Sequence, residues 1–355
     1  MSMTSPTEPE DASREVFPAP QPTSWRTWVV RGVTLAVGAF VLYGLLPQLV
    51  DLFSAVPRLR SIGWFALGFV AALQFASWWA SAELDRVALP SASRFAAVTT
   101  SLSANAISRV VPGAGGAMGV GLSYRMWAAS GVELGAAASA TAAVTVMSLA
   151  TLFALPVVTL LFALVGVPTP PSLAWVAVGG AIAFFVLFGL GTVLLVTDGL
   201  LHWTARLAER VAVRLHRDVT AAGIVQERDR LRDVLGERWP RALASSVAIW
   251  GFDYLSLVAV LVALHTHPKL SVVLLAFTAA KILGMVPITP GGLGIVEAGL
   301  TGTLVLAGIP GSEALLATLA YRIVSYWMSL PAGLIAYLLF KRRYPAVANR
   351  TAPAT

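Results

Sequence analysis

Pro287-Ile-Thr289-Pro290-Gly291-Gly292-Leu-Gly294-Ile-Val-Glu297 interrupts an apolar segment in the second half of the chain, directly after Lys281-Ile-Leu-Gly284-Met-Val. The first half has a similar stretch, Asn105-Ala-Ile-Ser-Arg109-Val-Val-Pro112-Gly113-Ala-Gly115-Gly116-Ala-Met-Gly119. Pro and Gly break helices, and the backbone groups that a break releases cannot face lipid. Each break is therefore expected to be buried in protein or to line a cavity. Breaks at matching places in two halves of a chain indicate the binding site of a transporter.

The composition is that of a polytopic membrane protein. Of the 355 residues, 57% are hydrophobic and only 12% are charged, whereas soluble domains carry roughly 25% charged residues. The formal charge of +7 is concentrated in a few flanking loops. That distribution favours a protein with basic cytoplasmic loops over a nucleic-acid binder. The chain has no cysteine, which excludes disulfides and thiolate chemistry.

The apolar segments predict an all-α polytopic membrane protein with about six full transmembrane helices and two re-entrant hairpins, arranged as two inverted repeats. A full crossing needs about 20 residues, and the segments of that length are 27–47, 61–82, 134–164, 173–196, 242–264 and 313–340. The pieces beside the breaks are too short to cross alone, and we expect them to form the hairpins: 95–111 with 116–130, and 271–286 with 293–307.

The flanking regions differ from this membrane domain. Residues 1–24 are rich in Pro, Ser, Thr and Glu, which predicts a disordered tail. The stretch 198–241 interleaves arginines with apolar residues, which predicts amphipathic helices on the cytoplasmic membrane surface. The predicted divisions are the tail 1–24, the membrane domain 25–342 with halves at about 25–166 and 172–342, and a C-terminal tail 343–355.

Charge placement predicts the orientation. Three crossings per half is an odd number, so the second half is inverted relative to the first. The N-terminal arginines, the patch 83–94, the stretch 198–241 and Lys341-Arg342-Arg343 then fall on one side, which should be the cytoplasm of a cell membrane. Both termini are expected on that side, while Arg58 and Arg60 are exceptions on the other. The two breaks would meet near the midplane.

Six charged residues lie in apolar context, and most of them flank the breaks. A charge at the bilayer centre costs at least ~2.5–3.5 kcal/mol, so each should pair or face a wet cavity. Four are positive and two negative, which favours an anionic ligand, and free N–H groups near Gly113 and Gly291 would suit a phosphate. The six are Arg109, Arg125, Asp253, Lys281, Glu297 and Arg322.

Structural roles remain as alternatives for most of these residues. Lys281 and Glu297 could form an ion pair that only seals the hairpin, and Asp253 could be the buried partner of an arginine. Arg322 could face the cavity or extend to a membrane interface. Three polar side chains at the breaks could simply hydrogen-bond the interrupted backbone: Asn105, Ser108 and Thr289.

The sequence lacks the common catalytic signatures. No phosphate-binding loop of the Gly-x4-Gly-Lys-Ser/Thr type is present, and no Ser-His-Asp arrangement stands out. The four histidines show no metal-binding spacing. We therefore expect no cofactor, no metal and no enzymatic reaction.

The second break resembles the signature of the lysylphosphatidylglycerol synthase transmembrane-region family, the flippase-like domain of the multiple peptide resistance factors and of stand-alone proteins. The residues that carry the resemblance run from Pro287 to Glu297 and continue with Gly308, Tyr321-Arg322 and Trp327. The first break is similar to the other motif of the family, from Asn105 and Pro112-Gly113 to Tyr124-Arg125 and Gly131. This chain reads Val-Gly-Leu after Gly119, where members often carry an acidic residue.

The resemblance implies a lipid translocase that moves an anionic phospholipid or an isoprenoid-linked lipid between leaflets. The resistance factors carry an aminoacyl-transferase domain after the membrane part, and this chain stops at Thr355, so no synthase reaction is implied. Two alternatives stay open: a membrane-embedded transferase or accessory subunit for lipid-linked glycan or aminoacyl-lipid synthesis, and a scaffold that recruits a protein partner through 198–241. The predicted lipid-binding residues are Asn105, Arg109, Gly113, Tyr124, Arg125, Lys281, Thr289, Gly291, Glu297 and Arg322.

Overall fold

The computed structural model describes residues 63–111, 115–164, 177–186, 188–189, 236, 238–285 and 292–345. The predicted tail 1–24, the predicted helix 27–47 and nearly all of the insert 198–241 lie outside the described residues, as do residues 346–355. Within the described ranges the chain forms helices and turns, with no strand. The prediction of an all-α protein is confirmed.

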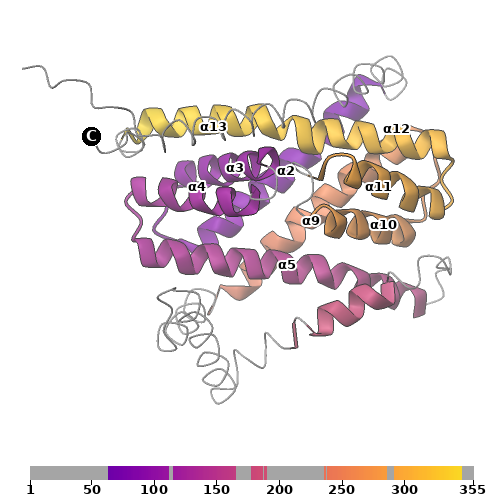
Figure 1. The fold of residues 1–355 in the computed structure, drawn as a ribbon, viewed down its shortest axis with the longest axis horizontal. Helices are drawn as coiled ribbons and strands as arrows, with labels where there is room; N and C mark the ends of the chain where they lie inside the picture. The colour runs from indigo at the N-terminus through magenta and orange to yellow at the C-terminus, as the bar shows by residue number, and fades with distance from the viewer. Residues whose placement is uncertain are drawn as a thin grey trace, which may run out of the picture.

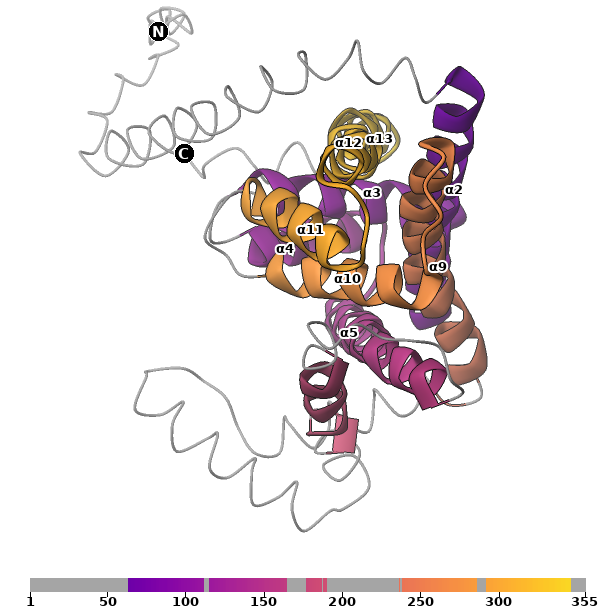
Figure 2. The same ribbon diagram turned by 90° about the vertical axis from the view of Figure 1, so that its right-hand side faces the viewer.

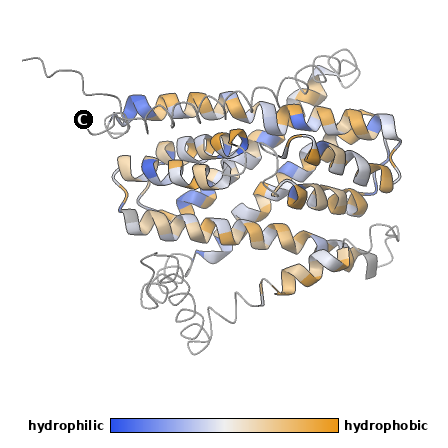
Figure 3. Ribbon diagram, in the orientation of Figure 1, coloured by the Kyte–Doolittle hydropathy of each residue, from blue (hydrophilic) through white to orange (hydrophobic). Residues whose placement is uncertain are grey.

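Four described helices are long and apolar enough to cross a membrane: Trp64–Ala88, Gly135–Phe162, Trp239–Ala263 and Gly311–Arg343. Their large apolar side chains point outward at many positions, as in Phe65, Val247 and Ile335. Outward apolar residues would be costly in water but suit a lipid-facing surface. Figure 3 shows this apolar character along all the long helices, with hydrophilic residues gathered at the C-terminal end of the last one.

The long helices form a frame around two shorter helix pairs (Figure 1). Helix α5 (Leu134–Leu164) borders one side, and the last helix borders the opposite side. This last helix consists of α12 (Gly311–Arg322), the π-helical turn η3 (Ile323–Trp327) and α13 (Ser329–Arg343). Helices α2 (Trp64–Ala88) and α9 (Trp239–Ala263) pack against each other along their length. Figure 2 views the same arrangement end-on.

Each break separates two short helices that pack as a hairpin. The first pair is α3 (Arg94–Val110) with α4 (Gly115–Ala129). The second is α10 (Leu270–Leu283) with α11 (Ile295–Leu306). At 1.5 Å per residue, even the 17 residues of α3 span only about 25 Å, less than the ~30 Å hydrocarbon core. Each short second helix ends two residues before a glycine with positive φ, Gly131 after α4 and Gly308 after α11.

Packing links each hairpin to the other half of the sequence. Helix α13, from the second half, packs on α3, and α5, from the first half, packs on α10. One apolar core joins the second hairpin to α9 and α12, and includes Leu257, Phe277 and Leu300. A separate core joins the first hairpin to the ends of α2 and α13, and includes Trp127 and Phe340. The hairpins are thus held from both halves.

Two helix predictions need correction. The helix expected at 61–82 continues to Ala88, and Arg86 and Glu83 form a 2.6 Å ion pair one turn apart near its end. The helix expected at 313–340 runs from Gly311 to Arg343 and contains a π-helical turn that no sequence pattern indicated. Of the helix predicted at 173–196, residues 177–186 are described and are helical.

Candidate functional site

The tips of the two hairpins border one cavity of about 330 Å³ in the middle of the helix bundle. Arg109 lies in the last turn of α3, and Lys281 lies in the last turn of α10. Asn105 joins them from the first hairpin and Gly284 from the second. Residues of α2, α5, α9, α11, α12 and η3 complete the lining. Asn105 and Lys281 are 176 positions apart in the sequence and therefore line the same cavity from different halves of the chain.

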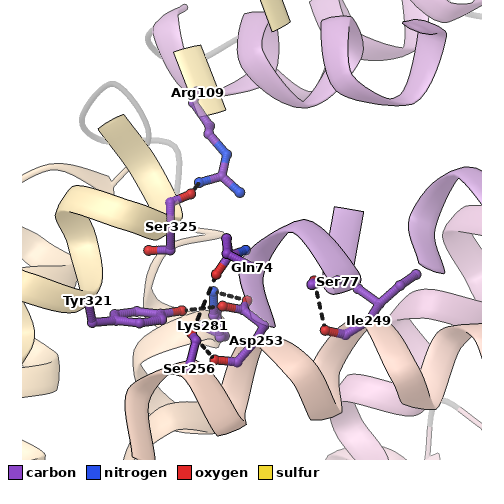
Figure 4. A network of polar contacts seen from close by, with 9 residues as sticks. All are labelled: Gln74, Ser77, Arg109, Ile249, Asp253, Ser256, Lys281, Tyr321 and Ser325. Carbon is purple, nitrogen blue, oxygen red and sulfur yellow. Dashed lines mark hydrogen bonds and ion pairs between the residues drawn. The ribbon is translucent and has the colours of Figure 1, made fainter. Parts of the chain in front are cut away.

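Asp253, from α9, holds Lys281 within this cavity (Figure 4). Its Oδ2 lies 2.5 Å from the Lys281 Nζ, and its Oδ1 accepts a 2.7 Å hydrogen bond from the Tyr321 hydroxyl. Asp253 is only 6% exposed, and no charge in such surroundings is stable without a partner. The aromatic ring of Phe277 lies 5.1 Å from the Lys281 Nζ, which adds a cation–π contact.

Glu297 and Arg322 form the second ion pair. Arg322 Nε lies 2.7 Å from Glu297 Oε1, and the Arg322 side chain borders the cavity. The other carboxylate oxygen of Glu297 accepts a 2.7 Å hydrogen bond from the backbone N–H of Gly294. That bond caps the first turn of α11, where a negative charge also interacts favourably with the positive end of the helix dipole. Glu297 thus connects the start of the second hairpin's return helix to the last membrane helix.

Arg109 differs from the other two cations. Its guanidinium donates to the backbone carbonyl of Ser325, and the Tyr326 hydroxyl donates back to the Arg109 carbonyl at 3.1 Å. Both partners lie in the π-helical turn, where the Met328 N–H bonds five residues back to Ile323. Such turns are frequent at functional sites. Among the described residues, no carboxylate lies within ion-pair distance of Arg109.

These pairings decide between the alternatives drawn from the sequence. Lys281 and Glu297 do not pair with each other, because Lys281 contacts Asp253 and Glu297 contacts Arg322. The cationic partner of Asp253 is accordingly a lysine instead of an arginine. Arg322 is 8% exposed and borders the cavity, so it does not extend to a membrane interface.

The structure brings together only part of the predicted site. Asn105, Arg109, Lys281 and Arg322 line the cavity, and Glu297 is one ion pair away. Tyr124 and Arg125 lie on α4 and do not line it: Tyr124 packs against the apolar core of the first hairpin, and Arg125 is exposed at a separate groove. The remaining predicted residues lie outside the described residues: Gly113, Thr289 and Gly291.

Several cavity residues were missed from sequence. Gln74, Ser77 and Ser81 line the cavity from α2, and Gln74 is only 2% exposed. Their spacing of three and four residues places them on one face of a helix. A polar stripe of this kind within an otherwise apolar crossing was a usable signal for the wall of a cavity. Gln74 accepts a 3.4 Å hydrogen bond from Ser256 of α9.

Comparison with known proteins places this bundle in a family. The family described as the lysylphosphatidylglycerol synthase TM region matches residues 29–333, which is most of the chain. The chain belongs to this family. The resemblance seen at the two breaks is therefore confirmed over nearly the whole membrane domain.

Individual relatives match over shorter stretches. Two UPF0104 membrane proteins of Methanothermobacter thermautotrophicus are similar to this lysylphosphatidylglycerol synthase TM-region protein. One is 33% identical over 90 residues, covering 25% of this chain and 27% of the relative; the other is 28% identical over 147 residues, covering 41% and 43%. A UPF0104 membrane protein of Methanocaldococcus jannaschii is 27% identical over 103 residues, covering 29% and 44%. These matches span less than half the length of each relative. No solved structure matches the chain.

Proposed function

We propose that this protein is a flippase-like translocase that moves an anionic phospholipid or isoprenoid-linked lipid between leaflets. In this proposal the phosphate of the head group enters the cavity between the hairpin tips, while the apolar tails stay in the bilayer. One observation carries the proposal. Arg109 borders the cavity from a hairpin tip, and no described carboxylate lies within ion-pair distance of it.

The charges of the cavity support an anionic ligand. Its described cations are Arg109, Lys281 and Arg322, whereas only Asp253 and Glu297 are available to neutralise them. Two of the three cations are engaged in those ion pairs. A buried charge is costly without a partner of opposite sign, and a phosphate beside Arg109 would supply that partner. Arg also offers planar donors that match phosphate oxygens.

The arrangement of the helices suits movement between two leaflets. The hairpins are packed by helices from both halves, and their tips meet around the cavity. In our proposal the halves are inverted repeats, and rocking one against the other would open the cavity alternately to each side. The protein would be multi-pass in the cell membrane with both termini in the cytoplasm, and would bind its lipid without performing an enzymatic reaction.

A vesicle assay tests this function. The full chain is purified and reconstituted into sealed phosphatidylcholine vesicles with a trace of head-group-labelled phosphatidylglycerol or, separately, labelled phosphatidylcholine. The expected result is protein-dependent movement of the anionic lipid between leaflets, faster than that of the zwitterionic one. Absence of any protein-dependent movement would contradict the proposal. Head-group transfer by the protein in detergent would favour the membrane-embedded transferase instead.

A further inference from the structure

A second hollow, separate from the polar cavity, lies between the first hairpin and the last helix. This groove has a volume of about 720 Å³ and is lined by residues of α3, α4 and α13. On α4 the lining residues include Met118, Gly121, Leu122 and Arg125, which follow one helix face. Met118 and Arg125 are seven residues apart, about 10 Å along the helix axis. The size is in the range of ligand-binding clefts.

The polar groups of the groove gather away from the hairpin tip. Arg125 lies in the C-terminal half of α4, and Ser103 lines the groove from α3. The Ser103 hydroxyl donates to the Thr99 carbonyl at 2.6 Å and lies 3.3 Å from the Gly333 carbonyl oxygen, which places α13 level with it. Tyr337 follows one turn later on α13. Toward the tip the lining is apolar, with Val110 and Met118. The groove is therefore polar at one end and apolar at the other.

The polar end lies toward the basic end of the bundle. Arg343, at the end of α13, lies 5.1 Å from the ring of Phe95 at the start of α3, so the basic ends of these helices meet. Figure 3 shows hydrophilic residues at this end of α13. Basic residues gather on the cytoplasmic side of membrane proteins. Arg125 is exposed, and no carboxylate among the described residues lies within ion-pair distance of it.

From this geometry we infer that the groove between α3, α4 and α13 binds a single anionic lipid, with its acyl or prenyl chain beside Gly121 and its phosphate at Arg125. The inference rests on the proposed function in one respect, since the lipid in the groove is of the same anionic class as the proposed substrate. A cation at the polar end and an apolar trough beyond it match an amphiphile with a negatively charged head.

Helix α3 separates this groove from the polar cavity. Asn105, Ser108 and Arg109 line the cavity, whereas Ala106, Ile107 and Val110 line the groove. The two sets alternate along the same two turns of the helix. A lipid in the groove, with its phosphate at Arg125, and a phosphate beside Arg109 in the cavity would thus occupy separate sites on opposite faces of one helix.

Gly121 offers a way to fill the groove without disturbing the fold. A Cβ atom added there would meet no atom within 4 Å. Gly302 on α11 is a matched control, because it is exposed, helical and equally open, and it does not line the groove. Gly121→Phe should occupy the space of the lipid chain, while Gly302→Phe should leave the groove as it is. Arg125→Gln removes only the charge at the polar end.

Photo-cross-linking of lipids to the reconstituted full chain tests the inference. Phosphatidylcholine vesicles carry a trace of phosphatidylglycerol or phosphatidylcholine with a diazirine in the acyl chain, and labelled peptides are mapped. In the unsubstituted protein, phosphatidylglycerol should label the groove residues severalfold more than phosphatidylcholine does. Gly121→Phe should remove most of this labelling and Gly302→Phe should not. Arg125→Gln should abolish the preference between the two lipids.

Two results would overturn the inference. Equal labelling by both lipids, unchanged by Gly121→Phe, would mean that only ordinary bilayer lipid contacts this surface. Because the chain has no cysteine, a disulfide between Met118→Cys and a single cysteine within 27–47 would show that a helix of this chain fills the groove. The assay needs no transport, so head-group-selective labelling without lipid movement would retain the groove and reject the translocase. Lipid movement without such labelling would retain the translocase and reject the groove as a lipid site.

Discussion

The two hairpins share a design but differ in how their charges are neutralised. In the second hairpin, Lys281 pairs with Asp253, and Glu297 pairs with Arg322. In the first hairpin, neither Arg109 nor Arg125 has a described carboxylate within ion-pair distance. The charges of the second hairpin are thus neutralised by ion pairs, whereas the first hairpin presents positive charge to a cavity and to a groove. Anion recognition in our account therefore belongs mainly to the first hairpin.

Removing the α9 carboxylate that neutralises Lys281 of the second hairpin should have the largest effect on stability. Asp253→Ala leaves Lys281 buried without its partner, and breaking such a pair costs about 3–5 kcal/mol. Thermal unfolding in detergent should show a strongly lowered midpoint or loss of folded protein. The double variant Asp253→Ala with Lys281→Met should recover much of the loss, because no lone charge remains. An unchanged midpoint in Asp253→Ala would remove the contrast between the hairpins.

Alanine substitutions of glycines should lower stability more in the first hairpin than in the second, because the first is packed more closely. A Cβ at Gly115 would lie 2.0 Å from the Ser108 carbonyl oxygen, a backbone atom of the paired helix. A Cβ at Gly299 in the second hairpin would meet only the end of the Leu283 side chain at 2.8 Å. Gly115→Ala should therefore cost about 1–3 kcal/mol of stability, and Gly299→Ala clearly less.

Gly116 provides the control for this comparison, because a Cβ there would meet nothing within 4 Å. Gly116→Ala should leave the unfolding midpoint nearly unchanged. If Gly115→Ala and Gly116→Ala were equally stable, α3 and α4 would not approach as closely as the structure indicates.

The smallest effect on stability should come from the hydrogen bond between the Tyr326 hydroxyl and the Arg109 carbonyl. Tyr326→Phe removes the hydroxyl that donates to the Arg109 carbonyl, and a typical hydrogen bond contributes about 0.5–1.5 kcal/mol. The aromatic ring stays in place beside both arginines. Tyr337→Phe is the control, since the structure gives that hydroxyl no partner among the described residues. An unfolding midpoint lowered equally in both variants would argue against a stabilising hydrogen bond between Tyr326 and Arg109.

The sequence predicted the elements that depend on periodicity and breakers. Long apolar runs indicated the crossings, and the Pro-Gly breaks indicated the hairpins, because these signals are local. The convergence of Arg109 and Lys281 on one cavity was also anticipated, since two halves with matching breaks place them near each other.

The partners in the ion pairs could not be predicted from the sequence. Whether Lys281 meets Glu297 or Asp253 depends on the rotation of α9 against α10, which no local pattern specifies. No local pattern indicated the π-helical turn either, which contacts Arg109 from a distant part of the chain. Arg125 was assigned to the cavity because it lies close to the first break in sequence. Its side chain instead borders the groove, on another face of the hairpin.

The central claim is that Arg109 binds the negative charge of a lipid head group in the cavity. The most direct test is the rate at which Arg109→Gln moves labelled phosphatidylglycerol across sealed vesicles. The control is Arg86→Gln, which changes a partly buried ion pair with Glu83 away from the cavity lining. Losing a charged hydrogen bond costs about 1.5–3 kcal/mol. The rate should therefore fall about ten- to a hundredfold in Arg109→Gln and remain unchanged in Arg86→Gln, with both proteins folded. A wild-type rate and an intact preference for the anionic lipid in Arg109→Gln would contradict the account.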